Sequence, residues 1–212
     1  MRLSTGPLEL KAGSSPVGRF IGVILVCAFW NGIVGVFVSG MIAGWTRGHP
    51  DYFLTVFLVP FLLVGLFLLW LSIHTFLAIF NPRPVLQINS SCVPLGGEFN
   101  VRWRLNGNAN KLTSFRVTLE GREEATYTRG TNTYTDRTVF HSQVFIEAST
   151  QFGFGGEGRV RVPKESMCSF HSSSNKVVWA LKAHGEIPRW PDVEEEYQIE
   201  VLPLPLTEFG RS

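Results

Sequence analysis

The sequence predicts two parts, an N-terminal hairpin of two transmembrane helices and an all-β antiparallel sandwich of about eight strands. Residues 20–43 and 52–80 are almost uninterrupted apolar runs, separated by a short turn. Each run is long enough to cross a bilayer as a helix, because about 20 residues at a rise of 1.5 Å cover roughly 30 Å. After residue 80 charged residues become frequent and apolar residues recur at every second position. That change of period indicates a β-domain.

The composition argues against several classes of protein. The 212 residues carry a formal net charge of +2 and no Lys/Arg-rich run, so no nucleic-acid partner is expected. Three cysteines are too few for a disulfide scaffold, and Cys27 lies in the first apolar run, so only Cys92 and Cys168 are able to pair. Residues 81–212 form a soluble unit of about 130 residues, which is large enough to bury its own core.

The tail, residues 1–19, contains glycine, serine and proline, which argue against stable structure there. The first apolar run is longer than the core of a signal peptide and a second run follows at once, which favours two retained spans. A hairpin returns to the side that it left, so the tail and residues 81–212 share one compartment. Basic residues are more frequent on that side, at Arg2, Lys11, Arg19 and Arg83, than in the turn. This bias predicts that both termini and the β-domain lie on the cytoplasmic side of the cell (inner) membrane.

The first span carries small side chains along one helix face, at spacings of three and four residues: Ala28, Gly32, Gly35, Ser39 and Ala43. Such a face lets another helix approach closely, where dispersion contacts hold helices together in lipid. The second span is the expected partner of this face, and another subunit is the alternative.

Two polar residues lie at membrane depth, Asn31 near the middle of the first span and His74 about two turns from the end of the second. An ionisable group inside a membrane suggests a transport or proton-relay site. The simpler interpretation is that Asn31 hydrogen-bonds the neighbouring helix and that neutral His74 faces it or reaches toward the interface. Their depths differ by roughly 7 Å, which disfavours direct pairing.

The sequence Asn81-Pro82-Arg83-Pro84 ends the second helix, and this short, stiff junction places the β-domain directly against the membrane surface. Strict alternation of apolar and polar residues then predicts strands with one buried face. The clearest strands are at 99–105, 115–119, 159–162, 176–183 and 197–201, and weaker ones are at 85–89, 123–129 and 137–146.

Turn signals separate these strands at 96–97, 106–108, 121, 130–132 and 153–158. Residues 122–129 are charged and threonine-rich on both faces, which predicts a location at a sheet edge. Residues 153–158 also satisfy G-x-G-x-x-G, but Arg159 continues as a strand and no helix follows to meet a pyrophosphate. A hairpin loop is therefore expected there.

The sequence Val160-Arg161-Val162-Pro163, then Ser169-Phe170, and the strands at 176–184 and 197–201 resemble the end of an arrestin-like or immunoglobulin-like sandwich. Two spans before a β-domain are also similar to small uncharacterised bacterial membrane proteins. The resemblance covers the last third of the chain. Arrestin-like domains usually occur as two sandwiches in tandem, and this chain has room for one. The resemblance implies a binding adaptor.

Cys168 and His171 have a spacing that suits two metal ligands, but zinc needs three or four, and no second clustered pair is present. The simpler interpretation is a half-buried thiol and a loop histidine. Nothing supplies an oxyanion hole or an orienting third group for a Cys–His nucleophile. In the cytoplasm Cys92 and Cys168 are expected to be reduced thiols.

Residues 185–192 place Trp190 and Arg189 in a loop that is stiffened by two prolines. Tryptophan and arginine are enriched at binding hot spots. Trp190 either covers the end of the sandwich as a plug or contacts a partner or lipid headgroups. Glu194, Glu195 and Glu196 are expected to be solvated at the start of a strand, with attraction of a basic partner as the alternative.

These patterns predict a membrane-anchored structural or interaction protein, not an enzyme and without a cofactor, whose β-sandwich binds a protein partner at the membrane surface. It is expected to be an accessory subunit of a membrane complex, with the lipid bilayer and a protein partner or homo-oligomer as its contacts. The alternatives are a small transporter or channel subunit that uses Asn31 and His74, and a ligand- or metal-binding domain.

Overall fold

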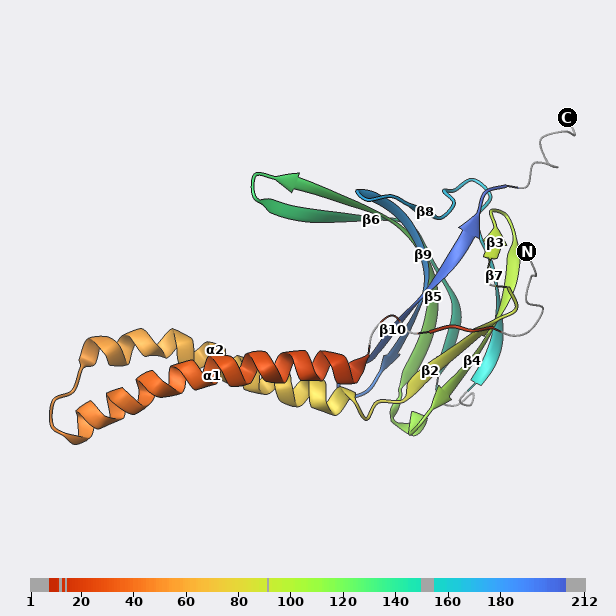
Figure 1. Cartoon of the computed structure of the whole chain (residues 1–212). Coiled ribbons are helices and arrows are strands. Elements are labelled where there is room, and N and C mark those ends of the chain that lie inside the picture. Colours follow the sequence, from red (N-terminus) through yellow and green to blue (C-terminus); the bar gives the residue numbers. More distant parts are fainter. Residues whose placement is uncertain (1–7, 12, 14, 91, 150–154, 205–212) are drawn as a thin grey trace, which may run out of the picture. The chain divides into compact units, whose positions relative to one another are not determined.

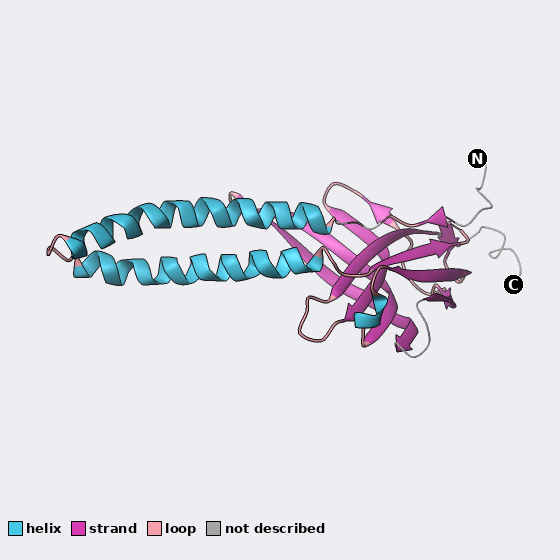
Figure 2. Ribbon diagram, turned by 90° about the horizontal axis from the view of Figure 1, so that it is seen from below, coloured by secondary structure: helices cyan, strands magenta, loops and turns pink. Residues whose placement is uncertain are grey.

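The computed structural model describes residues 8–11, 13, 15–90, 92–149 and 155–204. Its two helices form one compact unit, residues 14–80, and its strands form a second unit, residues 81–212 together with the N-terminal segment (Figure 1). The predicted division into a helical hairpin and a β-rich domain is therefore confirmed. Figure 2 separates the helices and the strands by colour.

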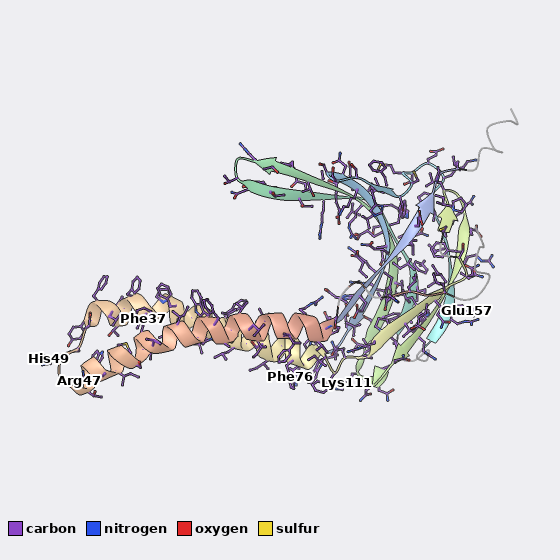
Figure 3. All side chains as sticks on the ribbon, in the orientation of Figure 1. Phe37, Arg47, His49, Phe76, Lys111 and Glu157 are labelled. Carbon is purple, nitrogen blue, oxygen red and sulfur yellow. The ribbon has the colours of Figure 1, made fainter. Side chains whose placement is uncertain are left out.

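The helical unit consists of α1 (Pro16–Thr46) and α2 (Tyr52–Ala78). The first helix begins at Pro16 and not at residue 20, because proline suits the first turn of a helix and the Ser15 hydroxyl accepts a hydrogen bond from the Gly18 N–H at 3.4 Å. Asp51 caps α2 in the same way, since its carboxylate accepts from the Leu54 N–H at 2.9 Å. Arg47 and His49 lie in the turn between the helices (Figure 3).

Large side chains join the two helices where they pack. Trp30 stacks on Phe61 with ring centroids 6.0 Å apart, and its indole N–H donates to the Phe61 carbonyl at 3.1 Å. Cys27 and Val34 on α1 and Leu58 on α2 are buried. Most other apolar side chains of both helices point outward and are exposed in the helical unit.

The strands form two sheets. The four-stranded sheet has the order β1-β2-β4-β7, with β1 (Leu8–Glu9), β2 (Arg83–Ile88), β4 (Glu98–Asn106) and β7 (Gly155–Arg161). The six-stranded sheet has the order β3-β10-β9-β5-β6, and β8 also pairs with β9; its members are β3 (Cys92–Pro94), β5 (Ser114–Arg129), β6 (Asn132–Ser149), β8 (Phe170–His171), β9 (Asn175–Glu186) and β10 (Val193–Leu202).

The described residues thus form ten strands where about eight were predicted, because β1, β3 and β8 are too short to show alternation and the strands predicted at 115–119 and 123–129 are one strand, β5. A 3-10 turn, η1 (Ala109–Lys111), lies between β4 and β5. The pair β3 and β10 is parallel, which departs from the predicted all-antiparallel arrangement. All other strand pairs in the described part of the chain are antiparallel.

The core lies between the two sheets. Trp103 of β4 and Phe115 of β5 meet there with ring centroids 4.9 Å apart, and Trp179 of β9 is fully buried. Tyr197 of β10 is also buried, and its hydroxyl donates to the Pro84 carbonyl of β2. Because these contacts link one sheet to the other, the β-domain is a sandwich around a single core.

The N-terminal segment is part of the β-domain. Leu8 pairs with Ile88 of β2, and the Leu10 N–H donates to the Leu86 carbonyl at 2.9 Å. The Gly13 N–H then donates to the Glu196 carbonyl of β10 at 3.0 Å. The expectation of an unstructured tail over residues 1–19 was therefore wrong for residues 8–11, 13 and 15–19, while residues 1–7, 12 and 14 lie outside the described residues. The segment is held because the Leu86 carbonyl of β2 and the Glu196 carbonyl of β10 accept hydrogen bonds from its backbone.

Strand β5 is continuous through Gly121 and through residues 122–125, where the sequence predicted a turn and a sheet edge. Gly121 was predicted to be a turn, yet it lies inside β5 beside a β-bulge. Residues 122–125 were predicted to lie at an edge, yet β5 is paired there with both β6 and β9. Only residues 126–129 pair with β6 alone, where the β5–β6 ribbon extends past β9 (Figure 1).

The glycine-rich stretch at 153–158 is not a hairpin loop over its described part. Gly155–Gly158 belong to β7 and pair with β4, while residues 153 and 154 lie outside the described residues. A Cβ at Gly156 would lie 3.2 Å from the indole nitrogen of Trp103, and a Cβ at Gly158 would lie 2.6 Å from the Ile146 side chain. These two glycines thus make room for core side chains.

Candidate interaction surfaces

The loop 187–192 between β9 and β10 has a fixed conformation. The Trp190 N–H donates to the Ile187 carbonyl at 3.2 Å, which closes a turn with Pro188 at its second position. The Asp192 carboxylate accepts from the Ile187 N–H at 3.2 Å and ties the two ends of the loop together. Proline in this position fixes φ in advance, so little backbone entropy is lost on ordering.

Trp190 is held at the end of the sandwich. Its indole N–H donates to the side-chain oxygen of Asn81 at 2.6 Å, and its ring is half-buried against the core. The Lys111 ammonium lies 4.5 Å from the centre of the ring, within cation–π range. The side-chain amide of Asn81 also donates to the Pro191 carbonyl at 2.8 Å. Of the two interpretations of Trp190, these contacts favour the plug.

Arg189 has a different position from Trp190, since it is exposed at the tip of the turn. Its φ of 59° lies in the left-handed region, and Arg189 is the one described residue other than glycine with a positive φ. This conformation costs a residue with a Cβ about 1 kcal/mol. The strained turn displays the Arg189 guanidinium to solvent.

The acidic residues at the start of β10 have separate environments. Glu194 is exposed, and its carboxylate lies 3.8 Å from Nδ1 of His184. Glu195 and Glu196 are half-buried, so the expectation that this stretch is solvated was wrong beyond Glu194. The strand period explains Glu195, because Glu195 and Tyr197 share the face that is turned toward the core, whereas Glu196 on the opposite face is covered by its ion pair with Arg122. The Tyr197 pKa is raised, by burial first and then by the charge of Glu195.

A charged cluster lies on the face of the six-stranded sheet that is turned away from the core. Its centre is Arg122, whose side chain is only 9% exposed. The guanidinium contacts Glu196 of β10 at 2.7 Å, Glu124 at 2.9 Å and Glu120 at 3.5 Å. Lys182 of β9 lies 2.6 Å from Glu120. Three adjacent strands are therefore linked by ion pairs with little access to water.

The protonation states in this cluster follow from its contacts. Burial opposes the charge on Arg122, but hydrogen bonds to Glu196 and Glu124 outweigh burial and raise the Arg122 pKa further. The hydrogen bond from Arg122 lowers the pKa of Glu124, against an opposing effect of burial, and the charges of Arg137 and Lys176 lower it further. Arg122 and Glu124 are thus both charged at neutral pH.

This cluster was not predicted from the sequence. Glu120, Arg122 and Glu124 alternate in sign at a spacing of two, which places them side by side on one face of a strand. The expectation of a turn at Gly121 divided that pattern and concealed it. With one continuous strand over this stretch, the alternating charges would have predicted a row of ion pairs.

The row of small residues on α1 lies largely on the outside of the helical unit. Ala28, Gly32, Gly35 and Ser39 are exposed, and a Cβ added at Gly32 or Gly35 would meet no atom within 4 Å. Packing of this row against α2 therefore does not occur at these glycines. Ala43, at the end of the row, is half-buried. Bulky residues make the helix contact instead, at Trp30 among others.

Asn31 and His74, the two polar residues weighed as a transport site, have separate contacts. The side-chain amide of Asn31 donates to the Cys27 carbonyl at 2.9 Å and to the Gly65 carbonyl of α2 at 3.4 Å. His74 stacks on Trp70 of its own helix with ring centroids 5.3 Å apart. Asn31 therefore joins the helices, as its simpler interpretation proposed.

The structure does not gather the residues that were weighed as metal ligands. Among the described residues, no group of three His, Cys, Asp or Glu side chains is placed to hold a metal ion. Cys168 is half-buried against the core, and His171 is exposed on β8. Neither Cys92 nor Cys168 forms a disulfide, and the Cys92 thiol lies 3.5 Å from a carboxylate oxygen of Glu200.

An open pocket of about 320 Å³ lies on the outer face of the four-stranded sheet, over β2, β4 and β7. Arg102 and Arg104 line it together with Glu157, which is labelled in Figure 3. Arg102 is paired with Glu157 at 2.5 Å, and both side chains are more than half exposed. Because this ion pair occupies the wall, the pocket offers few groups that converge on a ligand.

No protein-family model and no curated protein matches the chain. Among solved structures, the chain is similar to the crystal structure of Spo0M, a sporulation control protein from Bacillus subtilis. The similarity covers 57% of this chain and 49% of that chain, with 13% sequence identity and a TM-score of 0.39. This chain thus aligns with about half the length of that protein. A similarity at this level carries no information about function.

Proposed function

We propose that this chain is a two-span membrane protein whose β-domain binds a protein partner at the membrane surface, as an accessory subunit of a membrane complex. The outward-facing apolar side chains of α1 and α2 carry this proposal. Both helices are long and apolar enough to cross a bilayer. Phe37, Phe53 and Phe67 are each more than half exposed, and Phe37 is labelled in Figure 3. Lipid removes such side chains from water.

The fold of the β-domain supports a hairpin in the membrane. Residues 8–10 precede α1 and pair with β2, which follows α2. Both ends of the helical pair therefore lead into one sheet, and both must emerge on one side of the bilayer. The basic residues Lys11, Arg19 and Arg83 flank the spans on that side, which supports a cytoplasmic location in the inner membrane.

Two features support a partner. The exposed small residues Gly32 and Gly35 leave one face of α1 open to close approach by a helix of another protein. In the β-domain, Arg189 is exposed at the tip of a turn, where its φ of 59° is costly for a residue with a Cβ. The proposal assigns no catalytic step and no cofactor to the chain. A transport path is less well supported, because Asn31 already bonds within the hairpin.

Membrane insertion is tested by alkaline carbonate extraction of the full chain, followed by cysteine labelling in intact cells. We expect the chain to stay with the membrane, and Thr138→Cys to react with a membrane-impermeant maleimide only after cell lysis. His49→Cys, in the turn between the spans, is expected to react from outside. Labelling of Thr138→Cys in intact cells would reverse the orientation, and extraction into the soluble fraction would disprove insertion.

Partner binding is tested by in-cell photo-crosslinking from Arg189 and from Gly35. The matched control position is Arg159, an exposed residue on the other sheet. We expect the same membrane protein to be captured from Arg189 and from Gly35, but not from Arg159. Capture of nothing, or of the same proteins at all three positions, would contradict the proposal.

A further inference from the structure

The outer edge of β6 has the properties of an interface strand. β6 is the last strand of the six-stranded sheet, and within the described residues β5 is its only ladder partner. It spans 18 residues, whereas a typical strand has about five or six. Natural edge strands are usually shortened or carry lysine or proline, because their unpaired N–H and C=O groups bind other strands. β6 carries two β-bulges, which also protect sheet edges, but it has neither lysine nor proline.

Two bulges divide β6 and determine which side chains share a face. Val139 lies opposite Arg122 and His141 lies opposite Gly121, so Phe140 is an extra residue. Val144 lies opposite Thr118 and Ile146 lies opposite Val117, so Phe145 is a second extra residue. Both phenylalanine rings pack against the core. The side chains that remain on the outer face are Arg137, Val139, Ser142, Val144 and Glu147.

We propose that β6 pairs antiparallel with β6 of a second copy of this chain, about a two-fold axis at Ser142. With the two bulged residues left out of register, Arg137 lies opposite Glu147 and Val139 lies opposite Val144. Each of these pairs occurs twice, once on either side of the axis. Opposite charges and β-branched side chains are the cross-strand pairs that stabilise sheets.

Exposure agrees with this pairing. Val139 and Val144 are each 51% exposed on the single chain, and the two-fold axis brings all four valines of two copies into one patch. The remaining inner-face pairs, His141 with Gln143 and Thr138 with Ile146, carry no charge repulsion. The outer face of β6 has the same order of residue types from either end: charge, valine, serine, valine, charge. A second copy in antiparallel orientation therefore presents a complementary order by symmetry, whereas a strand from an unrelated protein would do so only by coincidence.

The pairing is tested by disulfide crosslinking of the full chain in detergent. In Ser142→Cys the two thiols meet at the axis, where cross-strand Cβ atoms lie about 5 Å apart and a disulfide is able to form. In the matched variant Thr138→Cys, on the same strand, the two thiols lie about 20 Å apart, at roughly 3.3 Å per residue pair. We expect several-fold more covalent dimer from Ser142→Cys. Equal crosslinking of both variants would overturn the proposal.

Charge exchange provides a second test in the same preparation. Glu147→Arg places like charges opposite Arg137 at both ends of the interface, which is expected to weaken self-association about tenfold. The double variant Arg137→Glu with Glu147→Arg restores opposite charges, and we expect it to recover the dimer. Circular dichroism verifies the fold of each variant. Failure of the double variant to recover the dimer would overturn the pairing. This proposal does not rest on the partner that is proposed above, because neither test uses Arg189 or Gly35.

Discussion

Single residues with buried charges determine much of the stability of the six-stranded sheet. Arg122→Met would leave Glu120, Glu124 and Glu196 close together without their central cation. Breaking a buried ion pair from one side costs about 3 kcal/mol or more. We therefore expect the free energy of unfolding of Arg122→Met to be lower than that of wild type by this amount at pH 7, as measured by chemical denaturation. Arg116→Met changes an exposed arginine on the same strand and serves as the control, with little expected effect.

The same cluster predicts a dependence on pH. Because the pKa of Glu124 is lowered in the fold, its ionised form stabilises the wild-type protein above the unfolded pKa of about 4.3. That contribution is lost as the pH falls through the lowered pKa. In Arg122→Met the carboxylates repel one another, so protonation stabilises the fold. The difference in free energy of unfolding between wild type and Arg122→Met should therefore shrink from pH 7 to pH 4.5. A difference that stays constant over this range would contradict the prediction.

Gly121 is a second residue whose replacement is expected to change stability, because the space around it leaves no room for a Cβ. A Cβ at this position would lie 2.5 Å from the ring of Phe140 and 3.1 Å from Trp179. Because both rings are packed, Gly121→Ala is expected to destabilise the β-domain by about 1–3 kcal/mol. Adding Phe140→Leu removes the obstructing ring edge and should return part of the loss. An additive effect of the two changes in denaturation experiments would contradict this explanation.

At the scale of elements, the 187–192 loop stores strain in one position. Arg189→Gly removes the Cβ that makes a φ of 59° costly, so we expect a gain of about 0.5–1 kcal/mol in stability. Arg189→Ala keeps the Cβ and should give no gain, although it removes the same charge. Thermal unfolding of the two variants separates backbone strain from charge. A gain in both variants would show that the guanidinium itself is unfavourable.

The N-terminal segment gives a prediction for the whole molecule. Leu10 packs against the core of the β-domain, whereas its neighbour Lys11 is exposed. Leu10→Asp places a carboxylate against apolar side chains and is expected to cost about 1–2 kcal/mol. Lys11→Asp, one residue away, should have little effect. Equal denaturation curves for Leu10→Asp and wild type would mean that the segment contributes nothing to the fold.

The sequence was sufficient for the parts of the molecule that follow a local period. Two apolar runs predicted α1 and α2, and alternation predicted β4, β9 and β10, because burial on one face imposes each pattern. Strands β1 and β3 were missed because two or three residues carry no period. The break predicted at Gly121 was wrong because sheet neighbours on both sides hold the glycine in the strand. The arrestin-like resemblance stays a prediction.

The candidate surfaces could be predicted from the sequence only in part. Trp190 was identified from its prolines, but its hydrogen bond to Asn81 joins residues that are far apart in the chain and leave no local signal. The Arg122 cluster draws on three strands, so its members converge only once the sheet order is known. The open edge of β6 is likewise a property of topology, although its symmetric order of residues is present in the sequence.

The pairing of β1 with β2 imposes an order on biosynthesis. A ribosome makes β1 first, then both apolar helices, and only afterwards the strand that β1 must join. In the proposed membrane topology, β1 and β2 lie on the same side of the bilayer only when α2 returns to the side that α1 left. The four-stranded sheet is therefore completed only after the proposed hairpin has formed.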